Sequence, residues 1–187
     1  GRGGGGGDGE VADLGAGRFD MLSRYEGGNK AGLEVYGGGK AFVLMLLPSV
    51  VIHEDKICVL GNGMVIDPKA FFDEIDQITA KGIAITPERL KVSSRAHLIM
   101  PYHRALDHTS EERLGNEKIG TTLRGIGPAY EDKAGRRGIR VADAMDPELL
   151  KLRIERNLEE ANRIIVLFGQ PPLRADEIFE EITPLVE

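Results

Sequence analysis

Residues 56–82 read KICVLGNGMVIDPKAFFDEIDQITAKG, and this stretch decides the expected fold. The apolar run at 56–60 predicts a strand covered on both faces, and Gly61-Asn62-Gly63 is expected to close it. Asp67-Pro68 then predicts a capped helix start. Gly82 is expected to end that helix. A strand followed by a helix indicates an α/β fold with a largely parallel sheet and flanking helices.

The same strand and helix signals recur on both sides of this stretch. Further strands are expected at residues 19–25, at 41–47, where Pro48 closes the apolar run, and at 90–92. Helices are expected at 102–114, from Asp146-Pro147-Glu148 to near Gly169, and at 175–185, while the Gly-rich, basic stretch 119–140 is expected to be irregular.

These expectations divide the chain into three parts. Residues 18–100 would form a partial α/β core, and residues 101–187 a mainly helical subdomain. Residues 1–17 are Gly-rich, since seven of the first ten residues are glycine. Glycine lets backbone N–H groups approach a phosphate, but the same composition is typical of a flexible tail. Both readings stay open, because no Walker pattern follows.

Composition excludes several classes of protein. The chain has 187 residues, of which 41% are hydrophobic, so one domain with a real core is expected. A net charge of −6 argues against a nonspecific nucleic-acid binder. The longest apolar run, 41–47, is far shorter than the ~20 residues that span a bilayer. We therefore expect no nucleic acid and no membrane as partners, and a cytoplasmic location. Since the chain starts at Gly1, we expect a fragment or a processed product.

A few other side chains have simple structural interpretations. Cys58, the single cysteine, is expected to be buried and inert. The four histidines are expected to be structural or solvated, since no pair has zinc-ligand spacing. His97, His103 and His108 are expected in or near a helix start, and His53 just before a strand. The acidic groups Asp73, Glu74, Asp76 and Glu155, Glu159, Glu160 are expected on wet helix faces.

The most informative chemistry lies at residues 119–133, which read IGTTLRGIGPAYEDK. Threonine hydroxyls, glycine turns and Arg124 suit a phosphate monoester, because arginine makes bidentate hydrogen bonds to phosphate oxygens. Arg136, Arg137 and Arg140 follow closely. A surface loop with solvated charges explains the same residues equally well, so the residue types alone leave both interpretations open.

The order of these residues closely resembles the signature of adenylosuccinate synthetases. Further matches are RYEGGN at 24–29, FVL at 42–44 with LPS at 47–49, GNG at 61–63, PYH at 101–103, ALD at 105–107 and RRG at 136–138. The resemblance covers residues 18 to 168. Family members are much longer, so the chain is similar to their front portion. It implies a P-loop-NTPase-like core that is incomplete here.

The resemblance also implies an activity and its ligands. The family joins IMP and L-aspartate to adenylosuccinate in AMP biosynthesis, using GTP and Mg²⁺. Thr122 matches the threonine on the IMP phosphate, and Arg136 an arginine that reaches IMP in the neighbouring subunit, which implies a homodimer. The implied IMP-binding residues are Asn29, Lys30, Ala31, Gly32, Thr121, Thr122, Arg124 and Arg136. The implied GTP-binding residues are Gly7, Gly9 and Gly32, and the Gly32 carbonyl is implied to touch Mg²⁺.

Several positions depart from the family pattern. The family's base aspartate falls at Gly5 or, in a shifted register, at Asp8, and the loop lysines are absent in either register. The family's histidine position is Leu33, and a glycine between Thr122 and Arg124 has become Leu123, whose Cβ is expected to hinder a positive-φ turn. We therefore expect an impaired fragment. The alternatives are a non-catalytic pseudoenzyme or a dimerising, anion-binding module, or a faulty gene model for the first 40 residues.

Overall fold

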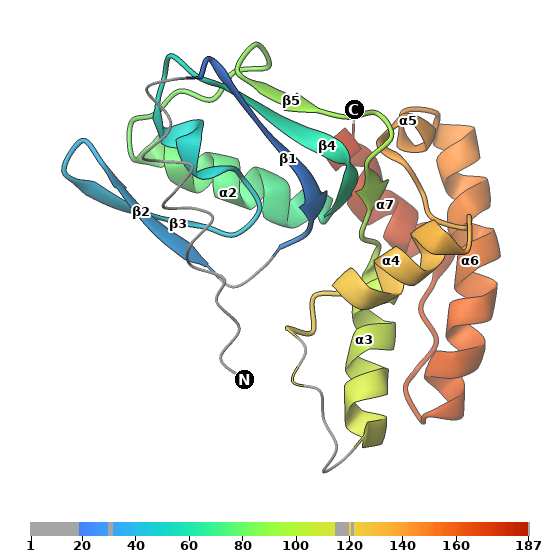
Figure 1. Cartoon of the computed structure of the whole chain (residues 1–187). Coiled ribbons are helices and arrows are strands. Elements are labelled where there is room, and N and C mark those ends of the chain that lie inside the picture. The colour runs from blue at the N-terminus through green and yellow to red at the C-terminus, as the bar shows by residue number, and fades with distance from the viewer. Residues whose placement is uncertain (1–18, 30–31, 115–119, 121, 187) are drawn as a thin grey trace.

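A computed structural model describes residues 19–29, 32–114, 120 and 122–186. Its main sheet is parallel throughout (Figure 1), with β1 (Met21–Gly27) and β5 (Leu90–Val92) on either side of β4 (Ile57–Ile66). The short strand β6 (His97–Leu98) also pairs with β4 in parallel. The predicted α/β fold with a largely parallel sheet is confirmed. His97, expected in or near a helix start, lies in this strand, shortly before the helix that begins at Pro101.

A hairpin stands beside this sheet and was not fully foreseen. β2 (Leu33–Gly37) and β3 (Lys40–Leu44) pair antiparallel through a turn at Gly38 and Gly39, whose φ values are +56° and +76°. Two positive φ angles are what a tight two-residue hairpin turn needs, and only glycine adopts them easily. The prediction of one strand at 41–47 covered on both faces was wrong, because Val43 faces solvent with 49% of its surface exposed.

The glycines of Gly61-Asn62-Gly63 do not close β4, and that prediction was wrong too. β4 continues through them to Ile66. The pairing of β1 with β4 shifts register between Arg24 and Glu26. A Cβ on Gly63 would clash with the Tyr25 carbonyl at this bulge. Glycine inside a strand here marks a close backbone approach rather than a strand end.

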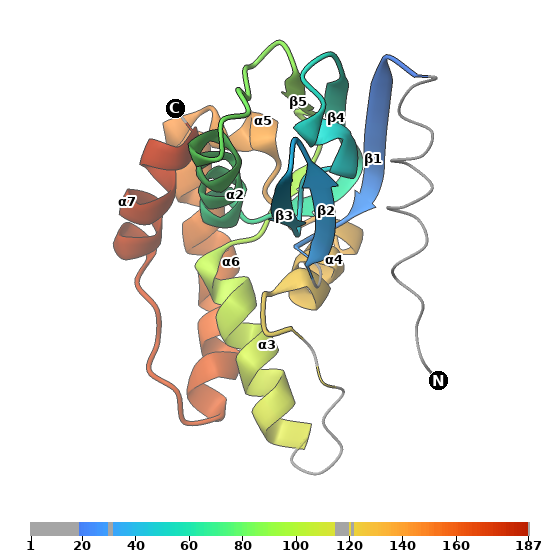
Figure 2. The ribbon, with the colours of Figure 1, turned by 90° about the vertical axis from the view of Figure 1, so that its left-hand side faces the viewer.

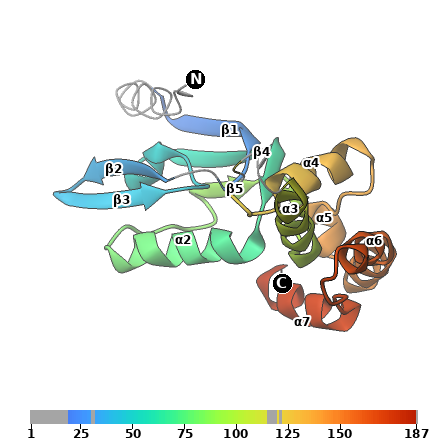
Figure 3. The ribbon, with the colours of Figure 1, turned by 90° about the horizontal axis from the view of Figure 1, so that it is seen from below.

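Helix α2 (Pro68–Ala80) forms as the local signals predict. Asp67 caps it, with its side chain accepting a hydrogen bond from Ala70 N at 3.2 Å. The helix stops before Gly82, whose φ is +95°. A short 3-10 helix, η2 (Ser49–Ile52), precedes β4 and is buried. Figure 2 and Figure 3 show α2 lying along one side of the sheet and hairpin.

The remaining helices gather at one end of the sheet (Figure 1, Figure 3). They are α3 (Pro101–Leu114), α4 (Ile126–Ala134), α5 (Val141–Ala144), α6 (Pro147–Leu167) and α7 (Ala175–Val186). The predictions of α3, α6 and α7 are confirmed. The expectation that 119–140 is irregular was wrong over α4, because Pro128 occupies the first helical turn, where a missing N–H costs nothing.

One buried apolar cluster joins the sheet to the helices. Leu60 and Met64 of β4 belong to the same cluster as Ile154 of α6 and Ile182 of α7. We propose that the boundary between the α/β core and the helical subdomain lies near residue 100, where the chain passes from β6 into α3. The first proposed part, residues 1–17, lies outside the described residues. Within the described part of the chain, no helix is long and apolar enough to cross a membrane.

Candidate functional site

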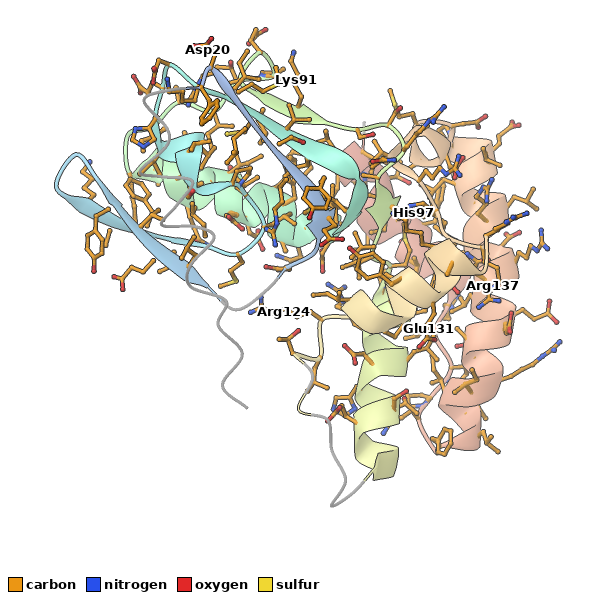
Figure 4. The ribbon with its side chains drawn as sticks, viewed as in Figure 1. Asp20, Lys91, His97, Arg124, Glu131 and Arg137 are labelled. Atoms are coloured by element: carbon orange, nitrogen blue, oxygen red, sulfur yellow. The ribbon has the colours of Figure 1, made fainter. Side chains whose placement is uncertain are left out.

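A guanidinium meets an asparagine at the start of α4. Arg124 Nη1 donates to Asn29 O at 3.2 Å and to Asn29 Oδ1 at 3.1 Å. It also lies 3.2 Å from Met45 Sδ. Arg124 is half-buried and Asn29 is buried. Figure 4 shows Arg124 between the segment that follows β1 and the start of α4. The contact joins three loops that are far apart in the sequence.

Gly125 sets the position of Arg124. It is the N-cap of α4, its φ is +76°, and its N–H donates to Asp107 Oδ2 at 2.8 Å. A Cβ at this position would lie 2.8 Å from the backbone of His103 and Arg104. Only glycine both adopts this positive φ easily and leaves room for the neighbouring backbone. Leu123, two residues earlier, also has a positive φ of 55°, so the turn expected to be hindered there is adopted by a non-glycine residue.

Tyr130 ties α4 to the carboxyl ends of β1 and β4. Its hydroxyl accepts from Gly27 N at 2.8 Å and lies 2.9 Å from Gly63 O and 3.2 Å from Gly27 O, to one of which it donates. Lys133 Nζ donates to Asn62 O at 2.9 Å. Arg124 therefore lies at the carboxyl edge of a parallel sheet. That edge is the usual place for ligands in open α/β folds.

The loop that carries Met45 is held by two charged side chains. Arg24 donates to the carbonyls of Met45 at 3.1 Å and Leu46 at 2.5 Å. Glu74 accepts the N–H groups of Met45, Leu46 and Leu47 at 3.2, 2.9 and 3.0 Å. Burial raises the pKa of Glu74, which those N–H groups and Arg24 oppose. The expected wet face was wrong for Glu74, which is 6% exposed.

Sequence reasoning overlooked Arg24 and Glu74 as residues that shape the site. Arg24 also donates to Gly28 O at 3.0 Å, next to Asn29. Burial lowers the pKa of the Arg24 guanidinium, and the charge of Glu74 opposes that shift. The one sequence signal for Arg24 was its place in the RYEGGN match. Glu74 gave no signal, because acidic residues on a helix are usually solvated.

The other expected site residues divide into three groups. Thr122 and Gly32 are exposed residues a short way along the chain from Arg124 and Asn29. Arg136 lies beyond the far end of α4, roughly 13 Å along a nine-residue helix. The structure thus brings Asn29 and Arg124 together and leaves Arg136 apart. The residues that lie outside the described part are Gly5, Gly7, Asp8, Gly9, Lys30, Ala31 and Thr121.

The sequence and the fold that carry this site match known proteins. The family model for adenylosuccinate synthetase matches residues 3–187. The chain belongs to the adenylosuccinate synthetase family.

Relatives of known name support this assignment at high identity. The adenylosuccinate synthetase of Nitratidesulfovibrio vulgaris is 48% identical over 178 residues, which are 94% of this chain and 42% of that protein. The adenylosuccinate synthetase of Clostridium novyi is 50% identical over 175 residues, 94% of this chain and 41% of that protein. This chain therefore spans less than half the length of the adenylosuccinate synthetases that it matches.

A solved structure has the same fold. A fully ligated adenylosuccinate synthetase from Plasmodium falciparum superposes with a TM-score of 0.81 at 31% identity. The match covers 98% of this chain and 43% of that one. The signature implies an incomplete P-loop-NTPase-like core in this chain. The fold match to the Plasmodium falciparum structure agrees with that expectation.

We propose that Leu33 stands at the position of a histidine in the synthetase signature. It begins β2, pairs with Leu44 and packs against the main apolar core. A leucine side chain has no hydrogen-bond donor for a phosphate oxygen. The described residues also include no group of three or more His, Cys, Asp or Glu side chains that could hold a metal ion. They do not by themselves fit Mg²⁺, since Gly32 contributes at most a single carbonyl.

Two of the histidines are buried within the fold. His103 is buried, its Nδ1 accepts from Met100 N at 2.9 Å, and its Nε2 lies 3.0 Å from Asp132 Oδ2. His97 is buried beside Gly138 and has no hydrogen-bond partner for Nδ1 among the described residues. Burial, followed by the charges of Lys133 and Arg140, lowers the pKa of His97 to about 4. His108 is exposed within α3.

Proposed function

We propose that this chain provides the IMP half-site for the ligation of IMP and L-aspartate to adenylosuccinate, in the cytoplasm. The observation that carries the proposal is the contact of Arg124 with Asn29 at the carboxyl edge of the sheet. Asn29 fixes Nη1 and so the plane of the guanidinium. A fixed guanidinium, with Thr122 two residues away in the sequence, suits the 5′-phosphate of IMP. Family membership supports the identity of the nucleotide.

The proposal extends to the other ligands of the family reaction. GTP would donate the phosphoryl group, with Mg²⁺ and L-aspartate as the further components, and Gly7, Gly9 and Gly32 are the positions proposed for GTP. The Gly32 carbonyl would be one Mg²⁺ ligand among others that the described residues do not supply. The site for IMP is proposed to include Lys30, Ala31 and Thr121 as well.

Arg136 is proposed to take part through a second copy of the chain. It lies at the opposite end of α4 from Arg124, away from the Arg124–Asn29 contact. A homodimer in which Arg136 reaches the IMP of the partner resolves this separation. Light scattering on the purified chain tests it, and a strict monomer at high concentration would refute the dimer.

We further propose that the chain alone has negligible turnover. The family's base position falls on Gly5 or Asp8, and losing a general base typically costs about 10²–10⁴-fold in rate. Leu33 packs into the core in place of a histidine that would stabilise the transferring phosphoryl group. Chromatographic detection of adenylosuccinate from IMP, GTP, aspartate and Mg²⁺ decides the matter. Clear product from this chain alone would overturn the proposal.

The second candidate function is a non-catalytic, anion-binding or dimerising module. Leu33 favours it, because a core leucine replaces a reacting group while the Arg124 contact is kept. The two functions differ in one respect. With the remaining portion of a family chain supplied in trans, the impaired fragment would make adenylosuccinate slowly, and the module would bind IMP without product.

Calorimetry with IMP and with GTP tests the half-site directly. Arg124→Lys keeps the positive charge but loses the planar fork, so IMP should bind about tenfold more weakly. Arg163→Lys is the matched control, since Arg163 pairs only with the exposed Glu159 on α6 among the described residues. GTP binding more tightly than IMP, or IMP binding that ignores the Arg124 change, would rule out the half-site.

A further inference from the structure

One face of helix α3 carries a row of buried polar side chains. His103, Asp107 and Glu111 follow one another at intervals of four residues, so they lie on one side of the helix. Their exposed fractions are 1%, 6% and 7%. The inward face of a helix is usually apolar, because burying a polar group costs free energy unless the group is paired. These three residues, the α3 polar row, therefore need partners inside the fold.

Two carboxylates of the α3 polar row hold the segment that leads into α4. Glu111 Oε2 accepts from Gly120 N at 3.2 Å, and Asp107 Oδ2 accepts from Gly125 N at 2.8 Å. Figure 1 and Figure 2 show the start of α4 beside α3, and the two carboxylates lie about one helical turn apart. The backbone is therefore held on both sides of Arg124, which the proposed IMP half-site uses.

The third member of the row fixes α4 itself. His103 Nε2 lies 3.0 Å from Asp132 Oδ2, near the carboxyl end of α4, and His103 Nδ1 accepts from Met100 N at 2.9 Å. A Cβ on Gly125, the N-cap of α4, would lie 2.9 Å from the His103 Cβ, so the N-cap packs directly on the row. Helix α3 thus sets the position of α4 near both of its ends.

Glu111 is not accounted for by stability alone. Its second carboxylate oxygen, Oε1, is buried and has no hydrogen-bond partner among the described residues. A buried oxygen without a partner opposes folding, because the water that it loses is not replaced. An apolar side chain would avoid that cost, but it could not accept the Gly120 N–H. What Glu111 provides at this position is therefore a fixed backbone rather than a more stable fold.

We propose that Asp107 and Glu111 are positioning residues for the Arg124 guanidinium, an inference that rests on the proposed IMP half-site. They act through the backbone: with two N–H groups held, Arg124 starts from a fixed point and its Nη1 reaches Asn29. A guanidinium that is already oriented loses less conformational freedom when a phosphate binds. Because the two carboxylates serve as acceptors of N–H groups, an amide side chain should replace either of them, whereas an apolar side chain should not.

Calorimetry with IMP on paired variants separates the hydrogen bond from the charge. Asp107→Asn and Glu111→Gln keep an acceptor oxygen and lose a charge that repels phosphate, so IMP should bind as tightly as to the parent or up to about threefold more tightly. Asp107→Leu and Glu111→Leu lose the acceptor, and each should weaken IMP binding at least about tenfold. Glu155→Leu removes an exposed carboxylate from α6 and is the control, which should leave binding unchanged. Circular dichroism verifies that each variant is folded.

A second measurement needs no ligand. NMR of the free protein follows the Arg124 side chain, because a guanidinium whose rotation is restricted gives separate Nη signals. These signals should stay separate in the amide variants and merge in the leucine variants. In the parent, the Gly125 N–H should exchange slowly with solvent. Fast exchange of this N–H in the folded parent would refute the positioning role, whether or not the leucine variants fold.

The remaining outcomes distinguish this inference from the half-site on which it rests. Folded leucine variants that bind IMP like the parent would refute the positioning role and leave the half-site intact. Amide variants that bind as weakly as the leucine variants would also refute it, since the N–H acceptors would then not be what matters. A parent that does not bind IMP, but whose Arg124 signals merge in the leucine variants, would refute the half-site and support the α3 polar row as the feature that orients Arg124.

Discussion

The Arg24 guanidinium and the Glu74 carboxylate hold opposite edges of one backbone segment. Arg24 donates hydrogen bonds to the carbonyls of Met45 and Leu46, while Glu74 accepts hydrogen bonds from the N–H groups of residues 45–47. The segment therefore has its polar groups satisfied although Leu46 and Leu47 are buried. Since Met45 contacts Arg124, Arg24 and Glu74 support the candidate IMP site by fixing the segment that carries Met45.

Glu74→Gln is expected to destabilise the fold by about 1–3 kcal/mol. The Glu74 carboxylate has two acceptor oxygens, whereas the glutamine amide has one oxygen and one NH₂ group. That NH₂ group would face the backbone N–H groups of residues 45–47, so at least one buried donor would lose its acceptor. Asp73→Asn, next along α2 but exposed and paired only with Lys69 among the described residues, should change stability by less than about 0.5 kcal/mol. Urea unfolding of both variants measures the difference. Equal stabilities would show that the Glu74 bonds contribute nothing.

His97 should make stability depend on pH in acid. Burial lowers its folded pKa to about 4 from an ordinary value of 6.5, so the folded state binds fewer protons than the unfolded state. Its contribution is present above about pH 6.5 and is lost as pH falls toward 4. Unfolding free energies across this range are compared for His97→Gln and His108→Gln. The profile of His97→Gln should flatten relative to that of His108→Gln, and parallel profiles would contradict the prediction.

Tyr130→Phe should loosen the attachment of α4 to the sheet. The change removes only the hydroxyl, which leaves the Gly27 N–H and the Gly63 carbonyl without this partner. Losing one such buried group typically costs about 1–3 kcal/mol. Tyr25→Phe is the control, since Tyr25 is 69% exposed. Thermal unfolding and IMP calorimetry are both informative, because a loosened α4 should also weaken IMP binding. A melting temperature equal to that of Tyr25→Phe would refute the anchoring role.

Local signals predicted the elements whose causes are local. Asp67 and Pro68 start α2 and Gly82 ends it, all within a few residues of the helix they control. The parallel sheet followed from apolar runs alternating with helices. The hairpin turn at Gly38 and Gly39 was missed, because the glycines gave no sign of which residues would pair across them.

Features that depend on distant partners could not be predicted from residue patterns. Helix α4 begins where Asp107, 18 residues away, receives the Gly125 N–H. The Arg124–Asn29 contact joins residues 95 positions apart and was not predicted, although the resemblance named both residues among those implied to bind IMP. Glu74 looked solvated because its buried partners belong to another segment.

Leu123→Gly is expected to stabilise the chain by up to about 1 kcal/mol. Leu123 has a φ of 55°, and a residue with a Cβ in the left-handed region costs about 1–2 kcal/mol relative to glycine. Glycine loses about 0.5–1 kcal/mol of this gain, because it makes the unfolded chain more flexible. The side chain is 43% exposed, so the loss of its partly buried apolar surface also reduces the gain. Stabilisation is expected where the relief of strain exceeds these two costs.

Leu152→Gly is the matched control, because it removes an exposed leucine from the regular helix α6. It should destabilise by about 0.5–1 kcal/mol, the cost of glycine inside a helix. Urea unfolding should thus give shifts of opposite sign for the two substitutions. The Leu123 change should also tighten IMP binding about two- to threefold if the phosphate-bound loop is more strained by leucine than the free loop is. Destabilisation by Leu123→Gly comparable to that of Leu152→Gly would mean that the Leu123 turn is not strained.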